Sequence, residues 1–491
     1  MSNFRYDRTP SIERVKYDLS NFVSIDGRVA QSSLNIKNGS YGYNIQLKGG
    51  IIQTGIGANE PRYHIGNGEF RVLPSLLPEG ENIVRLHYYR ASHLGGGSDR
   101  VVALGSEGGF YVCSLLTQDA FTPLSDLKGE SGKDAIMINY YLDGVDTLLI
   151  FYSGGMATYD GNTLTKVESA PIMHSATMLY DRVFGVSDDK LYFSAPLNPT
   201  DFSVEGGGGY LSFMDEGGAL KKIVTLGSEL YLFREHSIYR LSVLGKPTDY
   251  HLERLVSLNY TLIPKTIQVA GDTIYFVMSN KLYSFDGITL REVLSGVMAL
   301  VESTTHSVAT YFDDIYYLSC ALKTEGEKVG DEADLTVRYN NGVIYFDTLT
   351  GTIGIMRGVD IVGFFPVLTS VVKEIFLIYG NARSHRAGML TDDGKIYGTY
   401  LKKLYRSSTS NLGDLMTLKN LRRMYVDSDY DLTLKVKQGG EEHQVNVIGK
   451  DNKALPFRSI GHDFCYELSA DEDIFVKGVT LIFDKVRRYT A

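Results

Sequence analysis

The sequence predicts an all-β fold, a β-propeller of about seven blades, from a long-range repeat, a series of paired apolar strands and a turn-rich composition. The segment that runs from Asp146 to Val167 reappears without a gap between Asp272 and Val293, 126 residues further along. That distance equals three units of about 42 residues, the length of one four-stranded propeller blade. Repeats of this length are typical of folds whose units bury their apolar faces against one another.

Further copies of the unit can be counted along the chain. Each has a short apolar strand, a polar turn and a second strand containing tyrosine, as in 230–233 followed by 238–241. The first strands of these units begin near residues 101, 148, 183, 230, 274, 315 and 375. We therefore expect seven blades, with six or eight as alternatives because one hairpin could belong to a flanking region. A β-sandwich with accidental similarity is the competing architecture.

Composition and turn chemistry agree with this fold class. The 491 residues include 51 Gly and 34 Tyr but 12 Pro, which is typical of a turn-rich β chain. Runs of Val, Ile, Leu, Tyr and Phe favour strands that are covered on both faces. The Asp-Gly pairs at 160–161 and 286–287 predict hairpin turns, because glycine adopts positive φ without strain.

The chain divides into three parts. Residues 1–80 contain short strands and are expected to form a β arm that pairs with the last blade and closes the ring. Residues 81–400 contain the repeats and form the propeller. Residues 401–491 alternate apolar and polar side chains, as in 432–437 and 444–447, so we expect sheets with one solvated face in a small β-sandwich.

Three loops interrupt the regular pattern. Residues 324–334 form a charged insertion in the sixth unit, which we expect to be a solvated excursion; a contact arm for a partner is the alternative. The glycine runs at 205–209 and 95–98 predict flexible turns. Neither is a phosphate-binding loop, because no Gly-Lys-Ser/Thr follows.

The sequence contains no recognisable catalytic or metal-binding motif, so we predict no catalytic, cofactor or metal residues and no enzymatic activity. The ten histidines make no His-x-x-x-His or His-Glu-x-x-His pair, and there is no Gly-x-Ser-x-Gly motif. The acidic pairs 188–189, 313–314 and 392–393 are interpreted as turns rather than as a glycosidase pair. The cluster 427–431 lacks the glycine and distal glutamate of a calcium loop.

Charge and cysteine content narrow the function further. With 58 acidic and 49 basic residues the net charge is −9, which argues against gripping nucleic acid through a basic surface but not against letting it slide past. Cys113, Cys320 and Cys465 are too few and too far apart for a disulfide framework, so we expect buried free thiols. The polar N-terminus predicts no signal peptide, and no apolar run is long enough to span a membrane.

One stretch resembles a known family. Residues 178–202 combine the strand Leu191-Tyr192-Phe193-Ser194 with the phrase Pro199-Thr200-Asp201-Phe202, and together they resemble a propeller hairpin of phage virion proteins. Residues 232–239 resemble the adjoining blade of those proteins, and 478–489 their C-terminal β-domain. The family is that of the tail hub, nozzle and packaged-DNA-stabilising proteins of tailed bacteriophages. The resemblance covers about 170–300 well and the rest by architecture alone.

The resemblance implies a ring, expected to be a homo-hexamer, that lies below the portal and adaptor. Tail fibre, spike or needle proteins are further expected partners, and DNA would leave through the lumen without sequence-specific binding. The protein would be made in the host cytoplasm and reside in the virion tail. The acidic balance and the many tyrosines suit a DNA conduit and protein–protein contacts. The alternative is a receptor- or glycan-binding propeller at the tail tip or on a cell surface. A hydrolase ranks third, and the absence of tryptophan disfavours a sialidase-like Asp-box propeller.

Overall fold

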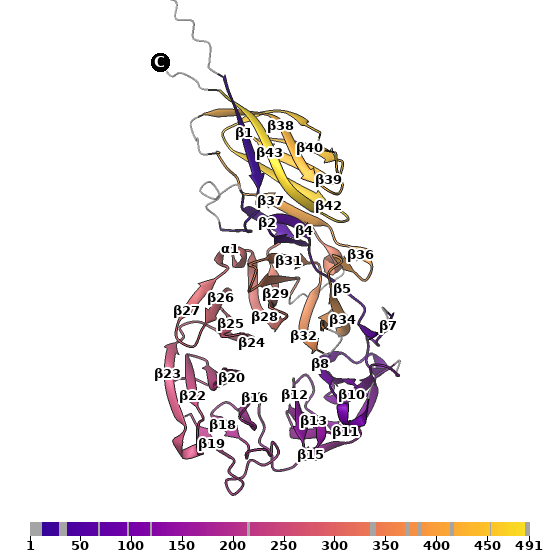
Figure 1. Ribbon diagram of the computed structural model, residues 1–491, viewed down its shortest axis with the longest axis vertical. Helices are drawn as coiled ribbons and strands as arrows, with labels where there is room; N and C mark the ends of the chain where they lie inside the picture. The colour runs from indigo at the N-terminus through magenta and orange to yellow at the C-terminus, as the bar shows by residue number, and fades with distance from the viewer. Residues whose placement is uncertain are drawn as a thin grey trace, which may run out of the picture.

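The computed structural model (Figure 1) describes residues 12–28, 37–66, 69–95, 98–117, 120–213, 217–333, 340–368, 373–380, 385–412, 417–451 and 453–486. Within these ranges the chain is nearly all strand. Small sheets surround a common axis, and a second β body is attached to the rim of this ring. The predicted fold class, a β-propeller with an N-terminal β arm and a C-terminal sandwich-like domain, is confirmed.

Seven sheets surround the axis in the described part of the chain, in agreement with the seven expected blades. The first five are four-stranded antiparallel sheets whose strands follow one another along the chain. Blade 1 contains β8 (Ile83–Tyr89), β9 (Arg100–Gly105), β10 (Gly109–Ser114) and β11 (Thr122–Lys128). Blade 2 contains β12 (Ile136–Leu142), β13 (Val145–Tyr152), β14 (Gly155–Tyr159) and β15 (Leu164–Val167). Blade 3 contains β16 (Ser175–Leu179), β17 (Arg182–Val186), β18 (Lys190–Phe193) and β19 (Gly209–Ser212).

The remaining blades complete the ring. Blade 4 contains β20 (Leu220–Leu226), β21 (Glu229–Arg234), β22 (Ser237–Ser242) and β23 (His251–Ser257). Blade 5 contains β24 (Leu262–Ala270), β25 (Thr273–Met278), β26 (Lys281–Phe285) and β27 (Leu290–Val293), and the short helix α1 (Ser295–Met298) follows it. Blade 6 contains β28 (Val301–Phe312), β29 (Ile315–Leu322), β30 (Gly342–Asp347) and β31 (Ile353–Arg357). Blade 7 contains β32 (Asp360–Leu368), β33 (Lys373–Gly380), β34 (His385–Thr391) and the N-terminal strand β5 (Gly57–Asn59).

The two copies of the sequence repeat are β13–β15 of blade 2 and β25–β27 of blade 5, three blades apart. One detail of the sequence interpretation is wrong: the apolar strands that marked the start of each unit are the second strand of each blade, not the first. Neighbouring blades cover the second strands on both faces, so these are continuously apolar, as in β13, where 147–152 are all buried. The first strands face the axis and have a mixed burial pattern, so no continuous apolar run marks them in the sequence.

The Asp-Gly turns are hairpin turns between the third and fourth strands, as predicted. Asp160 Oδ1 accepts hydrogen bonds from the backbone N–H groups of Asn162 (2.8 Å) and Thr163 (2.7 Å). Asp286 caps its own turn in the same way in blade 5, and Asp347 does so in blade 6. Gly161 and Gly287 have φ of +94° and +88°, which only glycine adopts without strain. The repeat therefore encodes a side-chain-capped turn.

The N-terminal arm is shared between both bodies. β5 pairs with β34 and so supplies the fourth strand of blade 7, beyond which the same sheet continues into β35 (Lys395–Ile396) and β36 (Thr399–Tyr400). Two earlier strands, β3 (Ile45–Lys48) and β4 (Ile51–Thr54), extend blade 6 outward from β31 to β43 (Phe475–Val486). A hairpin of β6 (Arg62–Gly66) and β7 (Glu69–Val72) leads into blade 1.

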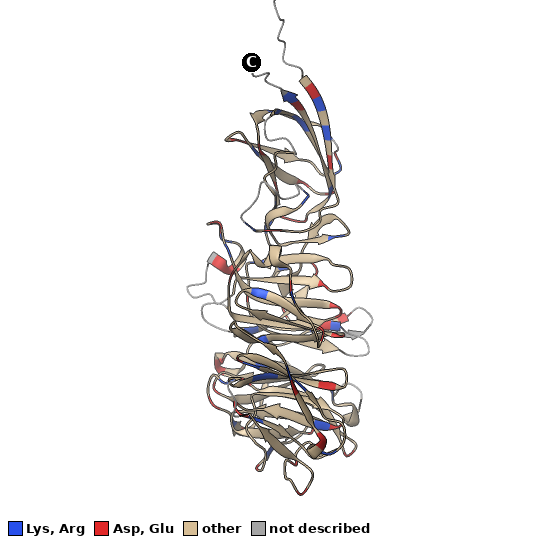
Figure 2. Ribbon diagram, turned by 90° about the vertical axis from the view of Figure 1, so that its left-hand side faces the viewer, with Lys and Arg blue, Asp and Glu red and all other residues tan. Residues whose placement is uncertain are grey.

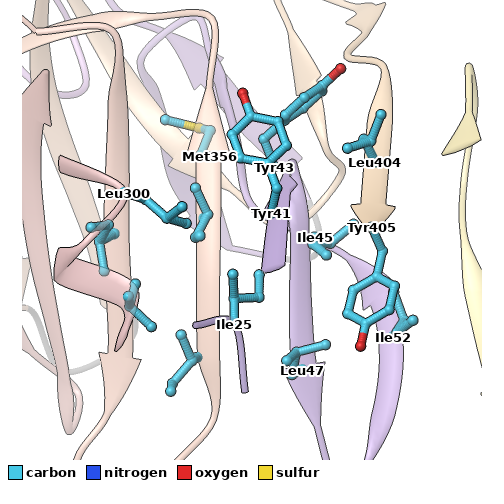
Figure 3. Close-up of a cluster of buried hydrophobic side chains, with 14 of the residues drawn as sticks. Ile25, Tyr41, Tyr43, Ile45, Leu47, Ile52, Leu300, Met356, Leu404 and Tyr405 are labelled. Carbon is cyan, nitrogen blue, oxygen red and sulfur yellow. The ribbon is translucent and has the colours of Figure 1, made fainter. Parts of the chain in front are cut away.

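Two sheets make up the C-terminal body. One contains β1 (Ile12–Ser20), β43, β38 (Leu418–Ser428) and β41 (Leu455–Gly461). The other contains β2 (Gly39–Tyr43), β37 (Lys403–Ser407), β42 (Phe464–Ala470), β39 (Leu432–Gln438) and β40 (Glu441–Val447). The alternation predicted for 432–437 is present, since Leu432, Leu434 and Val436 are buried and the intervening residues are not. Side chains from N-terminal strands fill the junction with the propeller, where Tyr41, Tyr43 and Ile45 pack near Met356 and Leu404 (Figure 3).

The charged insertion of blade 6 is largely exposed over 324–328, as expected of a solvated excursion, but Val329 and Glu332 anchor it and are buried. Glu332, in the 3₁₀ turn η5 (Gly330–Ala333), is fully buried and forms a two-pronged ion pair with the buried Arg357, at 2.8 and 2.9 Å. Arg357 Nη1 also donates to Tyr41 Oη (2.8 Å). Arg406 of β37 binds Glu325 (2.6 Å) in the same insertion. The insertion thus connects the propeller to the C-terminal body; the last predicted residue, Asp334, lies outside the described residues.

The other expectations have mixed outcomes. Cys113 and Cys320 are buried free thiols as expected, whereas Cys465 is only partly buried. The acidic pairs 188–189, 313–314 and 392–393 lie in turns or bends, and 429–431 connects β38 to β39 as a turn. The 205–209 run forms a turn before β19, and part of 95–98 lies outside the described residues. No helix among the described residues is long and apolar enough to cross a membrane.

Candidate functional site

The first strands of the blades surround the propeller axis and divide its surface into two faces. These strands, β8, β12, β16, β20, β24, β28 and β32, contact one another around the ring. We call the face where they begin the entry face and the face where they end the exit face. Because the strands of a blade alternate in direction, first-to-second and third-to-fourth turns lie on the exit face. Second-to-third turns and the connections between blades lie on the entry face.

A cavity of about 670 Å³ opens on the entry face at the mouth of the axis. Basic side chains from four different blades line it: Arg85, Lys133, Lys221, Lys222 and Lys265. Glu130, Asp134 and Asp188 are the acidic side chains of the lining. Its wall also includes the apolar side chains of Ile136, Ile172 and Pro264. A volume of this size falls within the range of small-molecule sites.

Asp134 is the centre of the charged group. Its carboxylate accepts two hydrogen bonds from the Arg85 guanidinium, Nε–Oδ1 2.7 Å and Nη2–Oδ2 3.0 Å, and lies 3.5 Å from Lys265 Nζ. Burial alone would raise the pKa of Asp134, but Arg85 and Lys265 outweigh it and lower that pKa to about 2. Arg85 also lies over the ring of Phe365 at 5.7 Å, which fixes the guanidinium between blade 7 and blade 2.

Lys222, at the start of β20, has no ion-pair partner among the described residues. Burial and then the positive charge of Arg85 lower the pKa of Lys222 to about 8, while Asp134 counteracts this only in part. The neighbouring Lys221 differs, because it pairs with Glu235 at 2.8 Å. The mouth therefore holds more positive charge than its own carboxylates neutralise.

A smaller cavity of about 430 Å³ lies at the exit-face end of the axis. Its lining includes Tyr140, Tyr141, Asn139, Arg90 and Asp146. Tyr141 is 68% exposed, so one aromatic ring stands free beside polar groups. Such a combination is able to hold a planar or sugar-like ligand.

The exit face is further distinguished by exposed apolar side chains at its turns. Leu197, Val204, Leu244, Ile288 and Leu349 are each 63 to 83% exposed and lie in third-to-fourth turns of blades 3 to 6. Further exposed apolar side chains on this face are Leu94, Leu116, Tyr141, Tyr180 and Leu368. The same turns carry many acids: Asp143, Asp160, Asp181, Asp201, Asp249, Asp272, Asp286, Asp313, Asp314 and Asp347. Basic residues beside them include Arg90, Arg100, Arg182, Lys246, Arg291 and Lys373.

The C-terminal body has its own basic surface. A hollow of about 880 Å³ is lined by Arg14, Arg422, Arg423 and Arg458, among others. Two of these share one carboxylate, since Arg14 and Arg422 both bind Asp484, at 2.8 and 2.7 Å, and this neutralises one of the two charges. In the side view of Figure 2 this body continues the long axis of the edge-on propeller, and β1 carries basic residues between two acidic ones.

The sequence predicts no site residues, so there are no predicted positions that the structure could bring together. The entry-mouth cluster was missed because its members are far apart in the chain and lie on the irregular first strands. A signal was present: a basic residue precedes several of the counted units, as at 85, 133, 221–222 and 265. No group of three or more His, Cys, Asp or Glu side chains in the described part of the chain could hold a metal ion.

Comparison with known proteins adds the following. No family model matches the chain, and no curated protein matches it. Among solved structures, BamB of Moraxella catarrhalis aligns over 77% of this chain and 97% of its own, with 10% identity and a TM-score of 0.39. PorZ of the type-IX secretion system of Porphyromonas gingivalis aligns over 76% and 46%, with 11% identity and a TM-score of 0.40. Chaetomium thermophilum Raptor aligns over 66% of this chain, which spans 29% of Raptor, with 8% identity and a TM-score of 0.45.

Proposed function

We propose that this chain is a structural, non-catalytic subunit of a phage tail hub or nozzle. In this role it assembles as a homo-hexameric ring below the portal and adaptor, retains packaged DNA and forms the conduit for its ejection. The observation that carries the proposal is the exit face, where exposed apolar side chains from all seven blades accompany acidic turns. The virion protein phrases at 178–202 and 478–489 direct the proposal to this family.

The exposed apolar side chains support a role in assembly. Single apolar residues are normal on a protein surface, but apolar side chains that gather on one face, with polar groups around them, mark an interaction site. Ile288 is 83% exposed and Leu349 is 76% exposed at equivalent places of two capped turns. The turns themselves are held by Asp286 and Asp347, so these apolar tips have defined positions and lose little entropy on binding.

The way the two bodies are joined supports a mechanically rigid subunit. One ten-stranded sheet runs from β28 of the propeller through β3 and β4 into β43, β38 and β41 of the C-terminal body. The buried Arg357–Glu332 pair fixes the insertion across the same junction. A ring that retains DNA under pressure needs subunits that do not bend at a linker. The DNA would pass through the lumen of the ring, and tail fibre, spike or needle proteins would bind at its distal side.

Electron microscopy of the purified protein, alone and mixed with a portal–adaptor complex of the same phage, tests the proposal. We expect the wild-type chain to add a ring below the adaptor. The double variant Ile288→Ser/Leu349→Ser should remain folded but join the assembly poorly, whereas Leu252→Ser, on the outer strand β23, should join normally. A stable monomer that never joins a portal–adaptor assembly or a tail would refute the proposal.

A second candidate function is favoured by one observation, the exit-face cavity with the exposed ring of Tyr141. Aromatic rings beside amide and acidic groups stack on sugars, so the chain could bind a glycan or receptor at the tail tip or on a cell surface. A glycan array distinguishes the two candidates. Saturable binding to one sugar class that is lost in Tyr141→Ala but kept in Tyr210→Ala would favour this second role.

A further inference from the structure

The mouth of the propeller axis on the entry face combines three cations with one shared carboxylate. Arg85, Lys222 and Lys265 come from blades 1, 4 and 5, and Asp134 precedes the first strand of blade 2. Arg85 and Lys265 both contact Asp134, at 2.7 and 3.5 Å. Within this group one carboxylate faces three cations. When Lys133, Glu130, Asp188 and the Lys221–Glu235 pair are counted as well, the mouth keeps an excess of one positive charge.

Ion pairs elsewhere in the lining do not remove this excess. Lys221 is paired with Glu235, which lies outside the cavity lining. Lys133, Glu130 and Asp188 also line the cavity, and together they reduce the excess by one charge without removing it. Like charges held close together in a partly enclosed space repel one another, and a low-dielectric wall strengthens that repulsion. Such an arrangement becomes favourable when an anion occupies it.

The lowered pKa of Lys222 follows from burial and from the same crowding of positive charge. Burial and Arg85 lower the pKa of Lys222 to about 8, so a fraction of its ammonium groups loses the proton near that pH. An anion at the mouth stabilises the charged form and raises this pKa again. Binding near pH 8 is therefore coupled to proton uptake, and affinity must fall as the pH rises above 8.

The wall explains why the ligand should be small. The cavity holds about 670 Å³, and Ile136, Ile172 and Pro264 provide apolar surface beside the charges. Because the Asp134 carboxylate occupies the fork of Arg85, the lysines remain as mobile point charges that suit phosphate oxygens. We propose that the entry mouth is a binding site for a small polyanion of the di- or triphosphate type, held by Lys222 and Lys265, with the positive charge of Arg85 beside them.

Titration calorimetry of the full chain with tripolyphosphate at pH 8 tests this site. We expect saturable binding with one ligand per chain, weakened at least tenfold in Lys222→Met/Lys265→Met. The matched control Lys246→Met removes an exposed lysine of the exit face and should leave affinity unchanged. None of the three lysines replaced in these two variants has a buried hydrogen-bond partner in the described part of the chain. A thermal melt confirms that each variant is folded.

A second readout separates this site from general charge attraction. Repeating the titration in two buffers of different ionisation enthalpy should reveal proton uptake by the wild type at pH 8 that disappears in Lys222→Met. Nucleoside triphosphate and citrate titrations then show whether phosphate or carboxylate is the preferred anion.

Three results would overturn the proposal. The first is no saturable binding of tripolyphosphate at millimolar concentration. The second is equal affinity in the wild type and in Lys222→Met/Lys265→Met. The third is binding that is confined to a 5′-phosphorylated oligonucleotide, which would assign the mouth to nucleic acid. Because these titrations use the isolated chain, their outcome is independent of whether it joins a portal–adaptor ring.

Discussion

At the scale of single residues, the most consequential side chains are buried charges. Arg357 is 1% exposed and Glu332 is fully buried, and the pair ties the blade 6 insertion to the body of the protein. A buried ion pair is weak evidence of net stability, since two charges have been removed from water. Its geometry nevertheless fixes where the insertion lies, because Arg357 also contacts Tyr41 of β2.

Removing one member of this pair should be strongly destabilising. We expect Arg357→Met to lower the free energy of unfolding by about 3–5 kcal/mol, because the buried Glu332 carboxylate would lose the guanidinium that balances its charge. The double variant Arg357→Met/Glu332→Leu should be less destabilised than the single variant. Urea denaturation measures all three, with Arg254→Met, an exposed arginine, as control. Additive effects of the two substitutions would contradict this view of the pair.

Lys403 offers a pH-dependent prediction. It is fully buried, and burial lowers its pKa to about 8, against which Asp473 and Asp393 act only in part. Between pH 8 and about 10.4 the unfolded chain holds a proton that the folded chain has released, so this residue makes stability rise with pH in that window. Below pH 8 the full penalty of the buried charge remains.

We therefore expect Lys403→Met to stabilise the protein most at pH 7.5, by up to about 3 kcal/mol, and less at pH 9.5. Melting temperatures of wild type and variant at the two pH values measure the difference. The neighbouring Lys402, whose side chain is 45% exposed, supplies the control Lys402→Met. A stability difference that does not change with pH would show that Lys403 keeps an ordinary pKa.

At the scale of elements, ring closure depends on a three-residue strand. β5 pairs with β34 and places the fully buried Ala58 opposite Leu390. A propeller without this strand would leave an open sheet edge on blade 7, which favours pairing with other chains. Closure by a segment from the far end of the sequence also joins the first and last blades into one cooperative ring.

Ala58→Asp tests the importance of this closure. An unpaired carboxylate at a fully buried strand position should lower stability by roughly 3 kcal/mol or more. Hydrogen exchange should quicken in β33 and β34 before it does in blades 2 to 5. Glu60→Ala, at an exposed position two residues later, should leave both readouts unchanged. Uniform loss of protection around the whole ring would mean that blade 7 does not open separately.

At the scale of the whole molecule, propeller and C-terminal body share one sheet and one apolar junction. Ile45 of β3 is fully buried and pairs with Ile355 on the propeller side and with Thr54 on the other. Domains connected by a flexible linker unfold separately, whereas a shared core couples them. The wild-type chain is therefore expected to unfold in one calorimetric transition.

Disrupting the shared sheet should uncouple the two bodies. Ile45→Asp places a charge in the junction core, and we expect it to split the single heat-capacity peak into two. Lys48→Ala, at the exposed end of the same strand, should preserve one peak. Two peaks already present in the wild type would show that the bodies unfold independently despite their shared strands.

Several features followed from sequence because they depend on residues close together in the chain. Local patterns predict the blade unit and the number of blades. These patterns are the apolar runs of β13 and β25 and the Asp-Gly turns at 160–161 and 286–287. The solvated excursion predicted for 324–334 agrees with the largely exposed 324–328 but not with Glu332, because the burial of Glu332 depends on Arg357, 25 residues away.

By itself the sequence determined the all-β class, the bladed repeat and the position of its capped turns, since hydrophobic period and turn chemistry act over a few residues. The tertiary structure decided which strand of each blade faces the axis, how the N-terminal arm joins both bodies and which charges meet at the entry mouth. Arg85, Asp134, Lys222 and Lys265 become neighbours only when the ring closes. Closure is a long-range event, so the basic residues that precede several units in the sequence do not by themselves show that they meet.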